Sequence, residues 1–169
     1  MEIDEKIREF ELKGHIVPDR GIIKTPREIE MIKASAIVNT GVLDHVSKNI
    51  KVGMSTEDID KLVYDFTTEH GAIPAPLDYE GFPKSCCTSI NNEVCHGIPD
   101  KNIILKEGDI INVDVSTIKD GYFSDASRMF VMEGASDEAK KLVDITKECL
   151  EVGIEQVKPW GHIGDIGAT

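Results

Sequence analysis

Aromatic residues make up only 5 % of this 169-residue chain, and basic residues are few: 19 Lys and Arg stand against 31 Asp and Glu, for a formal net charge of −12. A protein that binds nucleic acid typically presents a basic surface, so this balance argues against direct nucleic-acid binding. No apolar run approaches the roughly 18 residues that span a bilayer. The first five residues are acidic, whereas a signal peptide begins with basic residues. We therefore expect neither a membrane protein nor a secreted one.

Cysteine is also sparse. The four cysteines, Cys86, Cys87, Cys95 and Cys149, show no C-x-x-C spacing and no recognised zinc-site spacing with His96. Thiols in this pattern are typical of reduced cysteines in a cytoplasmic protein, where they serve as small buried residues.

Hydrophobic residues make up 40 % of the chain, which is enough to bury the core of one domain. Residues 1–23 combine weak helical spacing with breakers and are expected to form an amino-terminal arm that either packs on the domain or frays. The rest of the chain, residues 24–169, is expected to form the folded domain.

Helix-start signals occur three times in this domain, and each precedes apolar residues at helical spacing. Two are capping boxes, in which an acidic residue follows the cap by three positions, and the third is a lone serine; they are Thr25 with Glu28, Ser55 with Asp58, and Ser136. Between the second and third helices the pattern predicts a loop and short strands, namely a loop over 71–84, strands over 86–90 and 93–97, and a hairpin over 110–132. This arrangement predicts an α+β fold.

The predicted hairpin has a definite geometry. If Asp120 and Gly121 form a two-residue turn, the strand register follows, and the facing pairs are Lys119 with Tyr122, Ser116 with Asp125, and Asp114 with Ser127. Because side chains alternate between the faces of a strand, Asp114, Ser116, Asp125 and Ser127 then share one face. A three-residue loop would instead place the two aspartates on opposite faces.

Two interpretations of the aspartate pair remain open at this point. Like charges aimed into one hollow repel unless a cation, a shared proton or a basic partner neutralises them, which favours a metal site with Asp114 and Asp125 as ligands. With an imidazole nearby, such oxygen ligands suit Mn, Fe or Co, and Zn is also possible. The alternative is an ordinary solvated face of an edge hairpin in an acidic protein.

His96 precedes glycine and proline, which predicts a strand end with the imidazole at the rim of the sheet. A lone histidine there is more often structural than catalytic. Its neighbour Cys95 is a poor partner, because adjacent strand residues point to opposite faces, and this argues against a cysteine protease.

Six strings in order resemble the amino-terminal half of the type I methionine aminopeptidases. They are Tyr79-Glu80-Gly81-Phe82-Pro83-Lys84-Ser85, Ser89-Ile90-Asn91, Cys95-His96-Gly97-Ile98-Pro99, Leu105-Lys106-Glu107-Gly108-Asp109-Ile110, Asn112-Val113-Asp114 and Asp120-Gly121-Tyr122-Phe123-Ser124-Asp125. The resemblance covers about 24–169 and implies the first half of a pita-bread (creatinase/aminopeptidase) fold, with an antiparallel sheet and helices on one side.

The resemblance also implies roles for individual residues in removing the initiator methionine from nascent peptides. Asp114 matches the bidentate ligand of one metal ion, and Asp125 matches the aspartate that bridges two. His96 matches the histidine that hydrogen-bonds the substrate near the scissile amide. The remaining matches are Ser116, a small hydroxyl residue behind the metal ligands, and the substrate-pocket residues Tyr79, Phe82 and Cys87, of which Phe82 replaces a tyrosine.

The family takes its other ligands, a histidine in a Gly-His-Gly-Ile-Gly string and two glutamates, from a second half that is absent from this sequence. His162 is not that histidine, because its surroundings match the segment that leads into the second half. We therefore expect the chain alone to hold one or two divalent cations weakly or not at all, and to be inactive.

Other expectations follow from the same resemblance. The implied partner is a nascent polypeptide, with a ribosome as a further possibility, and the uncovered half-interface predicts self-association. Two alternative functions stay open: a non-catalytic peptide- or partner-binding homologue, and a pita-bread peptidase of aminopeptidase P or prolidase specificity.

Overall fold

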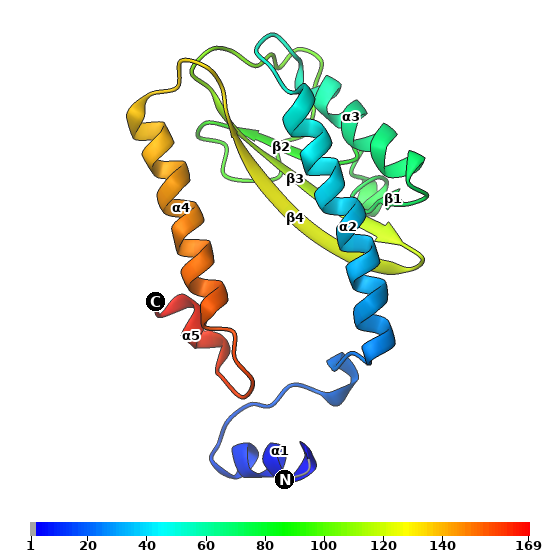
Figure 1. The fold of residues 1–169 in the computed structure, drawn as a ribbon, viewed down its shortest axis with the longest axis vertical. Helices are drawn as coiled ribbons and strands as arrows, with labels where there is room; N and C mark the ends of the chain where they lie inside the picture. The colour runs from blue at the N-terminus through cyan, green and yellow to red at the C-terminus, as the bar shows by residue number, and fades with distance from the viewer. Residues whose placement is uncertain (1–2) are drawn as a thin grey trace.

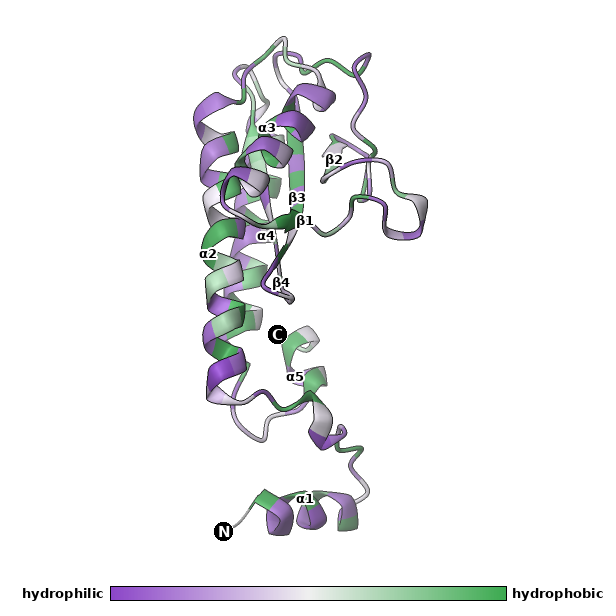
Figure 2. Cartoon of the chain, turned by 90° about the vertical axis from the view of Figure 1, so that its right-hand side faces the viewer, coloured by the Kyte–Doolittle hydropathy of each residue, from purple (hydrophilic) through white to green (hydrophobic). Residues whose placement is uncertain are grey.

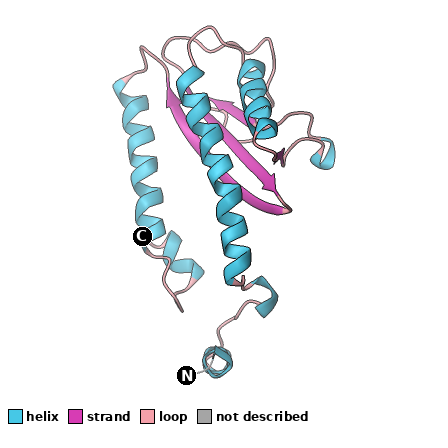
Figure 3. Cartoon of the chain, turned by 45° about the vertical axis from the view of Figure 1, so that its right-hand side comes forward, coloured by secondary structure: helices cyan, strands magenta, loops and turns pink. Residues whose placement is uncertain are grey.

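The computed structural model describes residues 3–169, so the first two residues of the predicted arm lie outside the described part. A four-stranded antiparallel sheet forms the centre of the molecule, with helices packed on one of its faces (Figures 1 and 3). The elements in chain order are α1 (Ile3–Leu12), η1 (Arg20–Ile22), α2 (Pro26–Asn49), α3 (Thr56–Glu69), β1 (Ile73–Pro74), η2 (Tyr79–Gly81), β2 (Cys87–Ile90), β3 (Ile110–Lys119), β4 (Tyr122–Val131), α4 (Asp137–Glu155) and α5 (Ile163–Gly167).

Each of the predicted helix starts is confirmed. Thr25 caps α2 and accepts a hydrogen bond from the Glu28 amide, while the Glu28 carboxylate accepts one from the Thr25 amide. Ser55 and Asp58 form the same reciprocal pair at α3. At α4 the Ser136 hydroxyl accepts from the Ala139 amide. The side-chain oxygens of these capping residues accept hydrogen bonds from backbone amides that have no partner within the helix.

Strand β3 is central to the sheet. It pairs with β4 along one edge and with the short strands β1 and β2 along the other. Alternate residues of β3 are fully buried and pack under α2 and α3, in a core formed by Val42, Leu43, Val46, Ile59, Val63, Cys86, Leu105, Ile111, Val113, Val115, Phe130 and Met132. Figure 2 shows hydrophobic and hydrophilic residues together along β3, as expected for a strand with one buried face.

Buried polar groups fasten α2 to the hairpin. The Asn39 side-chain amide donates to the backbone oxygen of Val115 at 2.6 Å and to the Thr117 hydroxyl at 3.2 Å. The Ser35 hydroxyl donates to the backbone oxygen of Thr117 at 3.0 Å. These bonds fix the helix against the strand whose opposite face carries Asp114.

The predicted strand over 93–97 is wrong. The chain turns at 90–93, where the Glu93 amide donates to the Ile90 oxygen at 3.0 Å, and Val94 is 93 % exposed. His96 has a φ of 58°, in the left-handed region that a strand does not use. The segment is a loop, and the loop expected over 71–84 contains the short strand β1.

Two of the four cysteines also differ from the prediction. Cys86 and Cys87 are buried as expected, but Cys95 and Cys149 are exposed. Cys95 belongs to the loop that was expected to be a strand, and Cys149 is part of α4, whose residues are mostly exposed.

The apolar stripe of α4 is exposed although its spacing predicts packing. Within α4 only Gly153 is buried, while Leu142 is 58 % exposed and Leu150 is 64 % exposed. Figure 1 shows α4 running beside the sheet and not under it. Nothing in the described part of the chain covers this stripe.

The arm contacts the segment between α4 and α5. The Phe10 ring centroid lies 5.6 Å from that of Trp160, and the His15 and His162 ring centroids are 4.8 Å apart. These contacts place α1 at the end of the molecule far from the sheet (Figure 1). No helix of the described residues is both long and apolar enough to cross a bilayer.

Candidate functional site

The hairpin register confirms the geometry on which the sequence argument depends. Asp120 and Gly121 have φ angles of 50° and 81°, which is the backbone of a two-residue turn with left-handed residues at both central positions. The resulting pairs are Lys119 with Tyr122, Ser116 with Asp125, and Asp114 with Ser127. Asp114, Ser116, Asp125 and Ser127 therefore share the face of the sheet opposite the helices.

Ser116 links the two strands on this face. Its hydroxyl donates a hydrogen bond of 2.5 Å to Oδ1 of Asp125, the residue directly across the ladder. Asp114, two residues earlier on β3, is half-buried, whereas Asp125 is exposed. The serine thus holds one carboxylate in place next to the other.

The electrostatics of the pair favour a bound cation. Burial raises the pKa of Asp114 above its usual value, the negative charge of Asp125 raises it further, and the neighbouring His96 acts in the opposite direction. A divalent cation between the carboxylates would remove this repulsion, and carboxylate oxygens suit such ions. The donor set therefore fits a metal. No group of three or more His, Cys, Asp and Glu side chains able to hold an ion occurs within residues 3–169.

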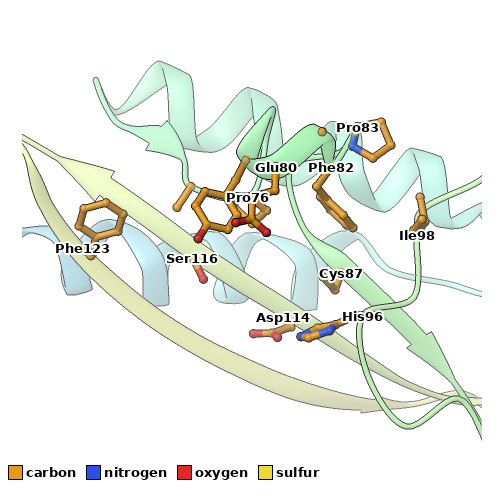
Figure 4. Close-up of a pocket in the computed structure, with 13 residues that line it drawn as sticks. Pro76, Glu80, Phe82, Pro83, Cys87, His96, Ile98, Asp114, Ser116 and Phe123 are labelled. Carbon is orange, nitrogen blue, oxygen red and sulfur yellow. The ribbon is translucent and has the colours of Figure 1, made fainter.

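His96 reaches the same place from a loop. The following residue, Gly97, is tied to β2: its oxygen accepts from the Thr88 amide at 2.8 Å, and its amide donates to the Ser89 hydroxyl at 3.2 Å. A Cβ built on Gly97 would lie 2.0 Å from the Thr88 oxygen, so only glycine fits. This close approach sets the imidazole beside Asp114, as Figure 4 shows.

A hollow of about 670 Å³ lies on this face. Six residues expected at the site line it: Tyr79, Phe82, Cys87, His96, Asp114 and Ser116. Figure 4 labels the last five of them. The seventh, Asp125, is not a lining residue, but its carboxylate accepts a hydrogen bond from Ser116, which is one. The structure thus brings together all the side chains that the sequence singled out.

Cys87 faces Asp114 across β2 and β3. Burial, and then the charge of Asp114, raises the pKa of its thiol to about 11. At neutral pH the side chain is an uncharged, polarisable group in the wall of the hollow, not a nucleophile.

Further lining residues were not predicted to belong to the site. They are Ala75, Pro76, Glu80, Gly81, Pro83, Ile98 and Phe123, and most belong to the segment before β2. Clustered proline and glycine in 71–84 predicted an irregular loop there, but gave no sign that it forms the wall of a hollow.

Helix α3 anchors that wall through contacts between residues distant in sequence. Oδ1 of Asp60 accepts from the Ser85 amide at 2.6 Å, and Lys84 pairs with Glu57 at 2.5 Å. Burial raises the pKa of Asp60, and the hydrogen bond from Ser85 partly offsets it.

Residues 30–169 match the model of metallopeptidase family M24. The chain belongs to this family. It is 51 % identical over 143 residues to methionine aminopeptidase A of Synechocystis, a match that covers 85 % of this chain and 56 % of the relative. It is 42 % identical over 148 residues to the methionine aminopeptidase of Escherichia coli K12, covering 87 % of this chain and 56 % of the relative.

Solved structures agree with the sequence comparisons. The crystal structure of methionine aminopeptidase from Rickettsia prowazekii superposes with a TM-score of 0.84 at 42 % identity, over 86 % of this chain and 58 % of that one. An X-Pro aminopeptidase from Thermotoga maritima shares the fold, with a TM-score of 0.66 at 21 % identity over 89 % of this chain and 38 % of that one. The M24 chain is therefore part of a pita-bread fold, and it spans just over half the length of the three methionine aminopeptidases named above.

Proposed function

We propose that the protein supplies two metal ligands and the methionine pocket of a methionine aminopeptidase, which removes the initiator methionine from nascent polypeptides. One observation carries the proposal: Asp114, the Ser116–Asp125 pair and His96 converge on one hollow whose wall contains Tyr79, Phe82 and Cys87. The 42–51 % identity to methionine aminopeptidases favours this specificity over that of the aminopeptidase P and prolidase relatives, which are 17–21 % identical.

In this proposal Asp114 and Asp125 hold one or two divalent cations, of which Mn, Fe, Co and Zn are the candidates. Such a metal lowers the pKa of a bound water and polarises a peptide carbonyl. His96 donates a hydrogen bond to the substrate near the scissile amide. The apolar wall accepts the flexible thioether of methionine, with which sulfur and aromatic groups make favourable contacts.

We further propose that catalysis needs ligands beyond this chain. Two carboxylates without a third protein ligand should hold a cation weakly, and the described residues contain no group of three or more His, Cys, Asp and Glu side chains able to hold an ion. In this proposal His96, which lies beside Asp114 (Figure 4), serves the substrate and not the metal. The activity then belongs to a cytoplasmic enzyme whose partner is the amino terminus of a nascent chain. With a net charge of −12, any association with the ribosome would run through protein surfaces and not through RNA.

A chimera tests the proposal. Residues 1–169 are joined to the remaining carboxyl-terminal part of the Synechocystis relative, and hydrolysis of Met-Ala-Ser is measured with added Mn²⁺. We expect turnover by the chimera, none by the 169-residue chain, and loss of at least 100-fold in D114N and D125N chimeras, since each removes a charged ligand. The matched control is S127A, which changes a residue of the same face that is no proposed ligand.

Two results would contradict the proposal. A folded chimera without activity would exclude this reaction, and full activity in the D125N chimera would exclude the metal site. Peptide binding by the chain that D114A leaves unchanged, together with an inactive chimera, would favour the non-catalytic alternative.

A further inference from the structure

The segment before β2 contains three residues with left-handed backbone. Asp78, Glu80 and Gly81 have φ angles of 66°, 48° and 85°. Glycine adopts such angles freely, but Asp and Glu do so at a cost, and strained residues of this kind cluster at binding and catalytic sites. The strain at Glu80 therefore calls for a functional explanation.

The consequence of this backbone is the position of the Glu80 side chain. Glu80 lines the hollow between Tyr79 and Phe82, the two aromatic residues proposed for the methionine pocket. Figure 4 shows it beside Pro76, across the hollow from the strand that carries Ser116 and Asp114. A carboxylate thus stands on the wall that is otherwise apolar.

Glu80 has no charged partner there. It takes part in none of the ion pairs found among residues 3–169, in contrast to the nearby Glu57, which pairs with Lys84. Lysine and arginine are absent from the residues that line the hollow. The free carboxylate and Asp114 therefore give both sides of the hollow a negative potential.

We propose that Glu80 is a specificity-determining residue that favours peptides with a basic side chain shortly after the first residue. This inference rests on the proposed function, because it takes the first side chain to lie between Tyr79 and Phe82. Glu80 lines the same hollow and is exposed, so a side chain that follows the first one can reach its carboxylate. A lysine or arginine there gains an ion pair, while an aspartate or glutamate meets repulsion.

The expected effect is modest. Glu80 is exposed, and ion pairs at exposed sites change affinity by about 1.5- to 5-fold. The preference should also shrink at high ionic strength, because salt screens exposed charges.

The test is binding of three matched peptides, Met-Ala-Lys, Met-Ala-Gln and Met-Ala-Glu, to the full 169-residue chain. Dissociation constants come from amide chemical shifts of residues 79–87, at about 20 mM and 500 mM salt.

We expect Met-Ala-Lys to bind about 1.5- to 5-fold more tightly than Met-Ala-Gln at low salt, and Met-Ala-Glu to bind more weakly. In E80Q the preference should shrink to the part that Asp114 supplies, whereas E148Q, on the distant helix α4, should keep the preference in full. Amide shifts of peptide-free E80Q that match those of the wild type outside residues 78–82 show that the fold is intact.

The outcomes separate this inference from the proposed function. Binding of all three peptides with no charge preference, or with a preference that E80Q retains in full, would overturn the role of Glu80 and leave the methionine pocket standing. Failure of every peptide to shift residues 79–87 would overturn this inference, whereas the proposed function is decided separately by the activity of the chimera.

Discussion

The backbone of Gly97 touches the backbone of Thr88. The Thr88 amide donates to the Gly97 oxygen at 2.8 Å, and a Cβ on Gly97 would lie 2.0 Å from the Thr88 oxygen. Since Gly97 directly follows His96, this contact determines where the imidazole stands relative to Asp114. A backbone contact between two distant segments thus positions a candidate catalytic side chain.

Gly97→Ala should therefore destabilise the protein and displace His96. The added methyl group has no space, and overpacking of a rigid site costs about 1–3 kcal/mol. Urea unfolding measures the free energy of unfolding, and the imidazole resonances report the position of His96. Gly164→Ala is the matched control, because a Cβ there meets nothing within 4 Å. Equal stability of the two variants would contradict the close contact.

Asn39→Ala should loosen α2 from the hairpin. The substitution removes the buried donor that serves the Val115 oxygen and the Thr117 hydroxyl, and loss of such a partner costs about 1–3 kcal/mol. Thr40→Ala, the next residue on α2 and exposed, should change the free energy of unfolding by less than about 0.5 kcal/mol. Denaturation of both variants in urea checks the difference, and equal midpoints would exclude a structural role for the Asn39 amide.

Asp58 and Asp60 should show opposite dependence of stability on pH. Hydrogen bonds from the Ser55 hydroxyl and amide lower the pKa of Asp58 below its usual 3.8, so its ionised form stabilises the fold. That stability is present above pH 3.8 and is lost as the pH falls through the lower folded pKa. Burial raises the pKa of Asp60, so the fold becomes relatively more stable as the pH falls and this carboxylate takes up a proton.

The two asparagine variants measure these effects separately. D58N should be less stable than the wild type by about 0.5–1 kcal/mol at pH 6, and the gap should close below pH 3.8. The free energy of unfolding of D60N, relative to that of the wild type, should be highest at pH 6 and should fall progressively toward pH 3. Parallel curves for the two variants between pH 3 and 6 would contradict the assigned pKa directions.

Local signals made much of the fold predictable. The capping boxes of Thr25 and Ser55 need only residues three positions away, and the turn at Asp120 and Gly121 fixed the register of β3 and β4. Because the register decides which side chains share a face, it also predicted that Asp114 and Asp125 lie together.

Contacts between distant segments were not predictable from the sequence. The segment 93–97 departs from a strand at His96, whose backbone is left-handed, and Gly97 then packs on Thr88. The wall of the hollow depends on the Asp60 bond to Ser85, 25 residues away. Alternation and spacing describe neighbours along the chain, so neither could reveal these contacts or the place of Glu80.

The cysteines should divide into two classes on alkylation. Cys86 is fully buried, with a pKa well above its usual value because of that burial, and Cys87 is 9 % exposed. Cys95 and Cys149 are exposed. With iodoacetamide at pH 8, mass spectrometry should show modification of the exposed pair in the native protein and of all four in urea. Modification of Cys86 at the rate of Cys149 would contradict the core packing.

The exposed stripe of α4 should drive self-association of the 169-residue chain. Leu142 and Leu150 are 58 % and 64 % exposed, and Ile145 and Ile154 on the same helix are also exposed. Contiguous apolar patches of this kind mark surfaces that bind protein, and burying one between two copies removes it from water.

Sedimentation equilibrium should show dimers or larger species at micromolar concentration, while L142K/L150K shifts the weight-average mass toward the monomer. Glu148→Lys adds a positive charge to α4 without removing an apolar group, so it should associate like the wild type. If the wild-type chain were monomeric at 100 µM, the exposed stripe would not drive self-association and this prediction would be wrong. The apolar residues of α4 would then have no packing partner in this chain.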